Sequence, residues 1–277
     1  LHTAYDYIRL GHPLSCILEW GIANLNNLQS KNVISFSSKT VPVLAILRKN
    51  LIENKNTHIF YTGELPAFFD AEILRHVYGY KFDLEQIETE NEIAATDCST
   101  VFISQQDEIG TIGANPNIDF FINIHPQFGS VLLVQGKQNE SYISEIQHVR
   151  RRETIAMTPA NCLAALNILL ERPSFDTKEN TLETDKTLVL NSIVGITGTT
   201  TKPLVASSGL SIQYAIMMGL VHDALENHKG KAIKFIVPPN CYGGTNDQAR
   251  RVAACIDNVE VVDLPVDGDN DMVQSIS

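Results

Sequence analysis

Two short turns carry the residues best suited to chemistry. The first, "SSGLS", covers residues 207–211, and the second, "CYGGT", covers residues 241–245. Each precedes an apolar helix pattern, and the free N–H groups at a helix start attract anions. Gly209 lets a ligand approach the backbone closely, whereas Tyr242 offers an aromatic face. Alone, "SSGLS" is typical of a serine N-cap with a packing glycine; together the two turns favour a site for a flat, phosphorylated molecule.

The elements around these turns alternate between strand and helix patterns, which predicts an α/β protein whose mostly parallel sheets are flanked by helices. We expect helices over residues 13–28, 41–52, 67–79, 141–155, 158–171, 208–225 and 244–255. We expect strands over residues 32–38, 57–63, 99–105, 119–124, 129–136, 188–196, 231–239 and 259–265.

A polar stretch divides the chain. Residues 172–187, "RPSFDTKENTLETDKT", are almost without apolar side chains, which is typical of a linker or a surface excursion. The sequence therefore predicts an α/β domain over residues 1–171, a linker over 172–187 and a second α/β unit over 188–277.

The two turns also match a known family. In order and spacing, "SSGLS", "CYGGT" and the following "VEVVDLPVDGDNDMVQSI" resemble the cysteine/methionine-metabolism family of enzymes that use pyridoxal 5'-phosphate (PLP). This family includes cystathionine γ-synthases, cystathionine β-lyases and methionine γ-lyase. The resemblance covers residues 199–276 and implies that the second unit begins a PLP-transferase large domain of the aspartate-aminotransferase type.

The resemblance also implies roles for individual residues. Gly209 and Leu210 would donate backbone N–H groups to the cofactor phosphate, Ser208 and Ser211 would lie beside it, and Tyr242 would stack on the pyridine ring. The implied activity is elimination or replacement at the β- or γ-carbon of an amino acid such as cystathionine or an O-acylated homoserine. The implied protein is a cytoplasmic homo-oligomer with a small amino-acid substrate.

The sequence departs from the family in two places. Where the family usually has Tyr-x-Arg, this chain reads "VGITGTTTKP". The family's Schiff-base lysine lies beyond the matched region, so the catalytic residues are unknown. We therefore expect the natural polypeptide to continue and the 277-residue chain alone to be inactive. The alternative is a non-catalytic α/β scaffold or binding protein with vestigial cofactor turns.

One stretch in the first part of the chain is weakly similar in sequence to the phosphate-turn region of the second part. "VISFSSKTVPVLAILRKNL" parallels "PLVASSGLSIQYAIMMGLV", with Lys39 where the phosphate-turn glycine would be. This pattern indicates either a degenerate copy of the same fold or an unrelated α/β domain.

Composition excludes several other functions. The formal net charge is −11, and nucleic-acid binding would need clustered basic residues. The basic run Arg150–Arg152 indicates either a solvated helix start or internal ion pairs, or else an anion contact. Apolar runs are too short for a membrane span.

The five scattered cysteines are typical of a reducing compartment. No metal site is predicted: "DGDNDM" (residues 267–272) has carboxylates at alternate positions, as a calcium loop does, but Met272 stands where such a loop needs glycine.

The polar stretch leads to a first prediction. Limited proteolysis of the folded protein should cut first within residues 172–187, because exposed polar linkers are preferred sites of cleavage. Mass spectrometry of the early fragments identifies the position of the cut. Early fragments that all arise elsewhere would contradict a linker at this position.

Overall fold

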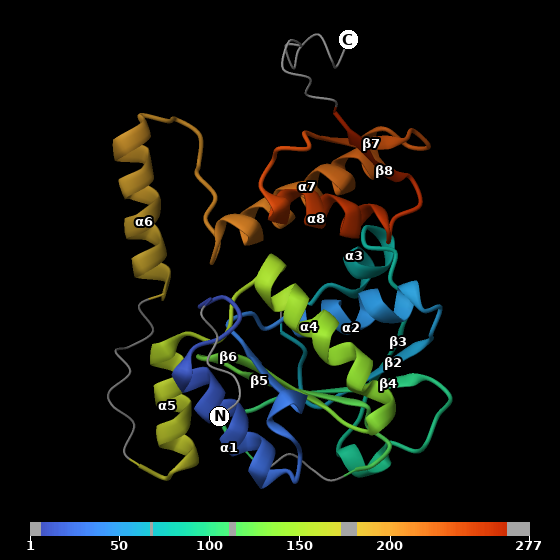
Figure 1. Cartoon of the computed structure of the whole chain (residues 1–277), viewed down its shortest axis with the longest axis vertical. Coiled ribbons are helices and arrows are strands. Elements are labelled where there is room, and N and C mark those ends of the chain that lie inside the picture. The colour runs from blue at the N-terminus through green and yellow to red at the C-terminus, as the bar shows by residue number, and fades with distance from the viewer. Residues whose placement is uncertain (1–6, 67–68, 111–114, 173–181, 265–277) are drawn as a thin grey trace.

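The structure of the protein is a computed structural model that describes residues 7–66, 69–110, 115–172 and 182–264. Its centre is a six-stranded sheet with the strand order β1-β6-β5-β4-β2-β3 (Figure 1). These strands are β1 (Val33–Phe36), β2 (Thr57–Tyr61), β3 (Asp83–Gln86), β4 (Ser99–Gln105), β5 (Phe120–His125) and β6 (Gly129–Val134). The α/β class with a mostly parallel sheet is confirmed, because only β6 among the described strands of this sheet runs against the others.

The direction of β6 follows from the short connection before it. Three residues separate β5 from β6, and parallel neighbours would need a crossover of a dozen or more. Gly129 begins β6 with φ +119°, and an added Cβ there would lie 2.1 Å from the backbone oxygen of Phe36. Only glycine fits this close approach of β6 to β1.

Helices cover both faces of the sheet (Figure 1). On one face, α1 (Pro13–Leu25) and α5 (Pro159–Leu169) enclose a core that includes Leu18, Phe102 and Phe121. On the other face, α2 (Val41–Ile52) and α4 (Glu140–Glu153) enclose a second core around Ile46, Ile122 and Ile146. The strands β5 and β6 are buried along their whole length, as expected for strands covered on both faces.

Local signals place several helix starts where the sequence predicts them. Thr158 is the N-cap of α5 and accepts a hydrogen bond from the Asn161 N–H at 3.2 Å, with Pro159 in the first turn. The remaining elements of this part are the short helix α3 (Ala71–His76) and the 3₁₀ turns η1 (Ser30–Asn32), η2 (Glu90–Glu92) and η3 (Lys137–Asn139). The strand β3 was not expected, because its residues are largely polar and exposed.

The part after residue 181 contains α6 (Leu182–Thr197), α7 (Gly209–Asn227), β7 (Ile233–Val237), α8 (Gly243–Ala253) and β8 (Val259–Asp263). The strands β7 and β8 pair in parallel through the α8 crossover. In Figure 1, α7 and α8 lie together beneath this small sheet, and α6 stands to one side.

The strand expected over residues 188–196 is wrong, since these residues lie within α6. Acidic residues in the first turn, Glu183 and Asp185, favour a helix start. The hydroxyl of Ser192 donates to the Leu188 carbonyl one turn earlier, and that of Thr197 donates to the Ile193 carbonyl. Because α6 begins at Leu182, it also takes in the end of the stretch assigned to a linker.

A buried ion pair of the first part is hydrogen-bonded to a tyrosine of the second part. The Arg48 guanidinium on α2 binds both carboxylate oxygens of Glu153, with the Nη2–Oε2 distance at 2.9 Å. The same Nη2 donates to the Tyr214 hydroxyl on α7 at 2.9 Å, and all three residues are buried. Burial raises the pKa of Tyr214 well above its ordinary value, so its hydroxyl stays protonated. The apolar core beneath α7 also contains Val77 from the first part.

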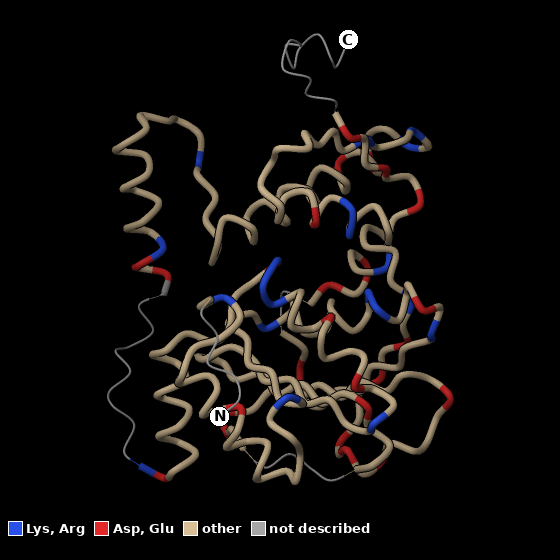
Figure 2. The backbone as a smooth tube through the Cα atoms, in the orientation of Figure 1, with Lys and Arg blue, Asp and Glu red and all other residues tan. Residues whose placement is uncertain are grey.

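Two arginines of the basic run form internal ion pairs. Arg150 is fully buried and its Nη1 lies 2.6 Å from Glu19 Oε1, whereas the Arg152 Nε lies 3.7 Å from Asp247 on α8. Figure 2 shows basic residues at the end of α4 that faces α7 and α8.

No sheet hydrogen bond joins described strands from the two sides of residues 172–187. The division into domains stays a prediction.

No helix within the described ranges is long and apolar enough to cross a membrane.

The Arg48 network gives a prediction about stability. Arg48→Met should lower the free energy of unfolding by about 3–5 kcal/mol, because it leaves the Glu153 carboxylate buried without its main partner. Lys31→Met is the matched control, since the Lys31–Glu140 pair is about half exposed and contributes at most about 1 kcal/mol. Urea denaturation followed by circular dichroism measures both. Equal losses of unfolding free energy in the two variants would show that the buried ion pair stabilises the protein no more than the exposed one.

Candidate functional site

The helix α7 begins at the predicted phosphate turn. Ser208 is its N-cap in an extended conformation, and its Oγ accepts a hydrogen bond from the Ser211 N–H at 3.1 Å. The hydroxyls of Ser207 and Ser208 lie 3.0 Å and 2.9 Å from the Ser211 hydroxyl. This serine cluster fixes the first turn of the helix, because the cap satisfies one of its unpaired donors.

Two backbone donors remain open at this end. Gly209 and Leu210 are the first two residues of α7, and their N–H groups have no acceptor within the described part of the chain. An added Cβ on Gly209 would meet nothing within 4 Å, so the space beside it is open. The arrangement suits an anion, since the positive end of a 19-residue helix faces this opening.

The second predicted turn lies at the start of α8. Tyr242 is the N-cap position of this helix, with its side chain 60% exposed. Its hydroxyl accepts a hydrogen bond from Arg9 Nη2 at 3.1 Å. The ring is therefore tethered at its far end while most of its surface is accessible for stacking.

The two turns touch each other. A Cβ added to Gly244 would lie 2.7 Å from Tyr242 Cε1 and 2.8 Å from Leu210 Cδ2, so both side chains pack on this glycine. The buried Gln248 side chain donates to the Leu210 carbonyl at 2.8 Å and to the Arg152 carbonyl at 2.6 Å. The structure thus brings the residues Ser208, Gly209, Leu210, Ser211 and Tyr242 together at two adjacent helix starts.

The position relative to the small sheet follows from connectivity. The helix α8 follows the carboxyl end of β7, whereas α7 ends just before the amino end of β7. Because Leu210 at the α7 start packs on Gly244 at the α8 start, the α7 start lies toward the carboxyl end of the strand. In parallel α/β folds this edge is where ligands bind. The expected strand before the first turn is absent from residues 188–207, so only the Tyr242 turn follows a strand.

The sequence reasoning missed the residues that hold this site against the first part. Gln248, Arg48 and Tyr214 are polar residues in helix patterns, and nothing in their spacing indicates burial. The similar sequence around Lys39 has a geometry different from that of the phosphate turn at residues 207–211. Ser38 Oγ accepts from the Val41 N–H at 3.1 Å, and the Lys39 amine donates to the Pro126 carbonyl. The start of α2 is thus capped by its own turn.

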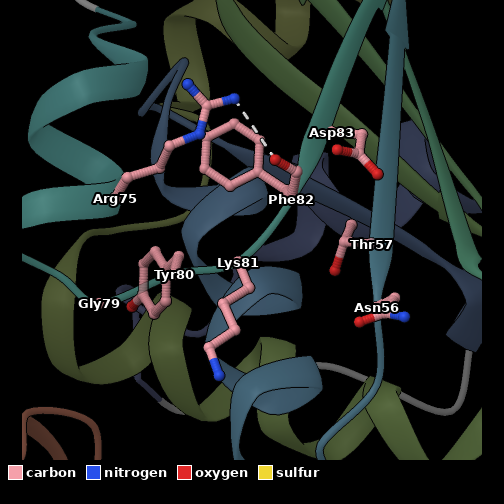
Figure 3. Close-up of a pocket in the computed structure, with 8 residues that line it drawn as sticks. All are labelled: Asn56, Thr57, Arg75, Gly79, Tyr80, Lys81, Phe82 and Asp83. Carbon is pink, nitrogen blue, oxygen red and sulfur yellow. Dashed lines mark hydrogen bonds between the residues drawn. The ribbon is translucent and has the colours of Figure 1, made fainter.

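A polar cleft of about 560 Å³ lies elsewhere, at the amino ends of β2 and β3 (Figure 3). Arg75 lies over the Phe82 ring and donates to the Phe82 carbonyl at 3.3 Å. Lys81 extends away from the Arg75 guanidinium (Figure 3), so the two cations do not converge on one ligand position. This cleft is at the edge opposite the one that parallel sheets use for ligands.

No group of three or more His, Cys, Asp or Glu side chains is arranged for a metal ion within the described ranges. The "DGDNDM" segment at 267–272 lies outside the described residues.

No protein-family model matches the sequence, and no curated protein matches it. Among solved structures, the chain is similar to cystathionine γ-lyase from yeast, with 13% identity and a TM-score of 0.42 over 70% of this chain and 58% of that one. It is similar to cystathionine γ-synthase from Xanthomonas oryzae pv. oryzae, with 10% identity and a TM-score of 0.40 over 70% and 58%. It is also similar to L-threonine-O-3-phosphate decarboxylase from Porphyromonas gingivalis, with 10% identity and a TM-score of 0.36 over 68% and 69%.

Two neighbouring glycines provide a matched test of the contact between the turns. Gly244→Ala should be less stable than Gly243→Ala by about 1 kcal/mol, because its Cβ would force the ends of the Tyr242 and Leu210 side chains to move. Gly243→Ala should be neutral or slightly stabilising, since an added Cβ there meets nothing within 4 Å. Thermal or urea unfolding measures both. If Gly244→Ala is as stable as Gly243→Ala, the two turns are not in the contact described.

Proposed function

We propose that this chain is part of a PLP-dependent enzyme of sulfur amino-acid metabolism and that the α7 and α8 starts hold the cofactor. In this proposal the N–H groups of Gly209 and Leu210 bind the phosphate, with Ser208 and Ser211 beside it. Tyr242 stacks on the ring. The substrate class is cystathionine or an O-acylhomoserine, and the reaction is elimination or replacement at the β- or γ-carbon. This finer assignment comes from the order and spacing of the two sequence motifs.

One observation carries the proposal: two open backbone N–H groups lie beside an exposed aromatic ring on the adjacent helix start. A phosphate requires close approach to the backbone, and the absence of a side chain at Gly209 provides it. A flat heteroaromatic ring requires a stacking surface, and Tyr242 is accessible for this purpose. The residues present therefore fit a phosphorylated aromatic cofactor.

The protein's contribution is to bind and orient. When bound, PLP supplies an electron sink for bond breaking at the amino acid. The α7 amides and the serine hydroxyls fix the phosphate end, whereas Tyr242 limits rotation of the ring. Arg9 holds the Tyr242 hydroxyl and so limits the movement of this side chain. The catalytic lysine is unassigned, so the roles proposed for these residues are binding and orientation of the cofactor.

Binding of PLP by the chain tests the proposal, followed by absorbance or by equilibrium dialysis. Gly209→Val should abolish most of the binding, because its side chain would occupy the space needed by the phosphate. Gly219→Val is the matched control, since this glycine is exposed in the same helix and also has open space around it. Tyr242→Ala should weaken binding by about 0.5–1.5 kcal/mol through the loss of stacking.

Three outcomes separate the alternatives. Loss of binding in Gly209→Val but not in Gly219→Val supports the cofactor site. Wild-type protein that binds neither PLP nor inorganic phosphate leaves the alternative, a scaffold with vestigial turns. Equal binding by both glycine variants would place any PLP site elsewhere.

A further inference from the structure

The outer side of the layer formed by α1 and α5 is apolar and carries no charge. The two helices contact each other over one face of the central sheet, since a Cβ added to Gly21 would lie 3.3 Å from Leu169 Cδ2. Their one charged residue, Glu19, is buried. Large apolar side chains in these helices, or directly after α5, stay exposed, and we call them the α1–α5 face: Ile17, Trp20, Leu25, Leu163 and Leu170.

The composition of the α1–α5 face is that of an interaction surface. Trp20, the single tryptophan of the chain, is 52% exposed. Aromatic side chains are enriched and charged side chains are depleted at the centre of protein interfaces. The absence of charge on both helices also restricts the partner, because a charged surface placed here would lose its water without gaining an opposite charge. The matching surface must therefore be apolar and uncharged.

The helix α6 has this character. None of residues 183–197 is buried within the described part of the chain, and the helix stands to one side (Figure 1). Its side chains Leu188, Val189, Val194 and Ile196 are exposed, and no residue from 187 to 197 is charged (Figure 2). A helical segment without a charged side is normally buried, and a lone helix of 16 residues is marginal in water. The helix α6 therefore also requires a covering surface.

A second copy of the chain supplies both covering surfaces. Pairing of α6 with another α6 would leave the α1–α5 face exposed, and pairing of that face with itself would leave α6 exposed. An exchange between two copies covers both with one type of contact, made twice about a two-fold axis. The charge of the chain favours this arrangement, since two copies with a formal net charge of −11 repel each other least where neither surface is charged.

We propose that two copies of this chain form a dimer by exchange of α6, which packs on the α1–α5 face of the other copy. The contact is apolar on both sides, with Trp20 near its centre and α6 laid across the two helices. This inference is independent of the proposed function, because none of the residues assigned to the cofactor belongs to α6 or to the α1–α5 face.

Analytical ultracentrifugation of the full chain tests the proposal. Leu188→Glu places a charge on α6, and Leu163→Glu places one on the α1–α5 face. Each should raise the dimer dissociation constant by at least about tenfold, because the charge would be buried without a partner. Ile52→Glu is the matched control and should associate as wild type, since Ile52 is 60% exposed at the end of α2, on the opposite face of the sheet. Circular dichroism shows whether the variants are folded.

A mixture of the two variants distinguishes exchange from other arrangements. The Leu163→Glu chain keeps an intact α6, and the Leu188→Glu chain keeps an intact α1–α5 face. Under exchange the mixture regains one of the two contacts, so it should form a heterodimer more tightly than either variant associates with itself. Fluorescence of Trp20 gives a second readout. Its emission should shift to shorter wavelength as the wild-type concentration rises, whereas in Leu188→Glu it should not.

The opposite results each overturn the exchange. A wild-type chain that stays monomeric refutes it, and a concentration-independent shielding of Trp20 in that monomer would mean that α6 covers the face of its own copy. Wild-type association in Leu163→Glu would indicate pairing of α6 with α6, and wild-type association in Leu188→Glu would indicate pairing through the α1–α5 face alone. Weak association of both variants that mixing does not strengthen would also exclude the exchange.

Discussion

The placement of the candidate site depends on the buried contact between Arg48, Glu153 and Tyr214. A guanidinium and a carboxylate taken out of water must remain paired, because either one alone would be strongly unfavourable. The third member comes from α7, five residues after the open amide of Gly209. The interaction that satisfies the ion pair therefore also fixes α7 against α2 and α4. Gln248 adds a second tie, from α8 to the carbonyls of Arg152 and Leu210.

Much of the fold could be predicted because its signals are local. Thr158 and Ser208 are N-caps whose function depends on neighbouring residues alone, and both helices begin where they indicate. The segment around residues 188–196 was misjudged for a physical reason. A short apolar run with β-branched residues suits either a strand or a helix, and the acidic first turn that decides the matter lies before it, in residues assigned to the linker.

The candidate site also contains some features that the local sequence predicts and others that it does not. Ser208, Gly209 and Leu210 act through one helix start, so their arrangement follows from five consecutive residues. The contacts made by Gly244 and Gln248 depend on segments far apart in the sequence. Such contacts leave no periodic signal in a single chain. They are also the contacts that turn two separate helix starts into one surface.

The Tyr214 contact has a consequence for the way this chain can change in length. Each residue of an α-helix turns the backbone by about 100°. With Tyr214 anchored to Arg48, an insertion or deletion of one residue between Gly209 and Tyr214 would rotate the open amides to another side of α7. The same change among residues 198–207, before the helix, would leave their direction intact. Length variation is thus compatible with the site before Ser208 and incompatible with it in the first turns of α7.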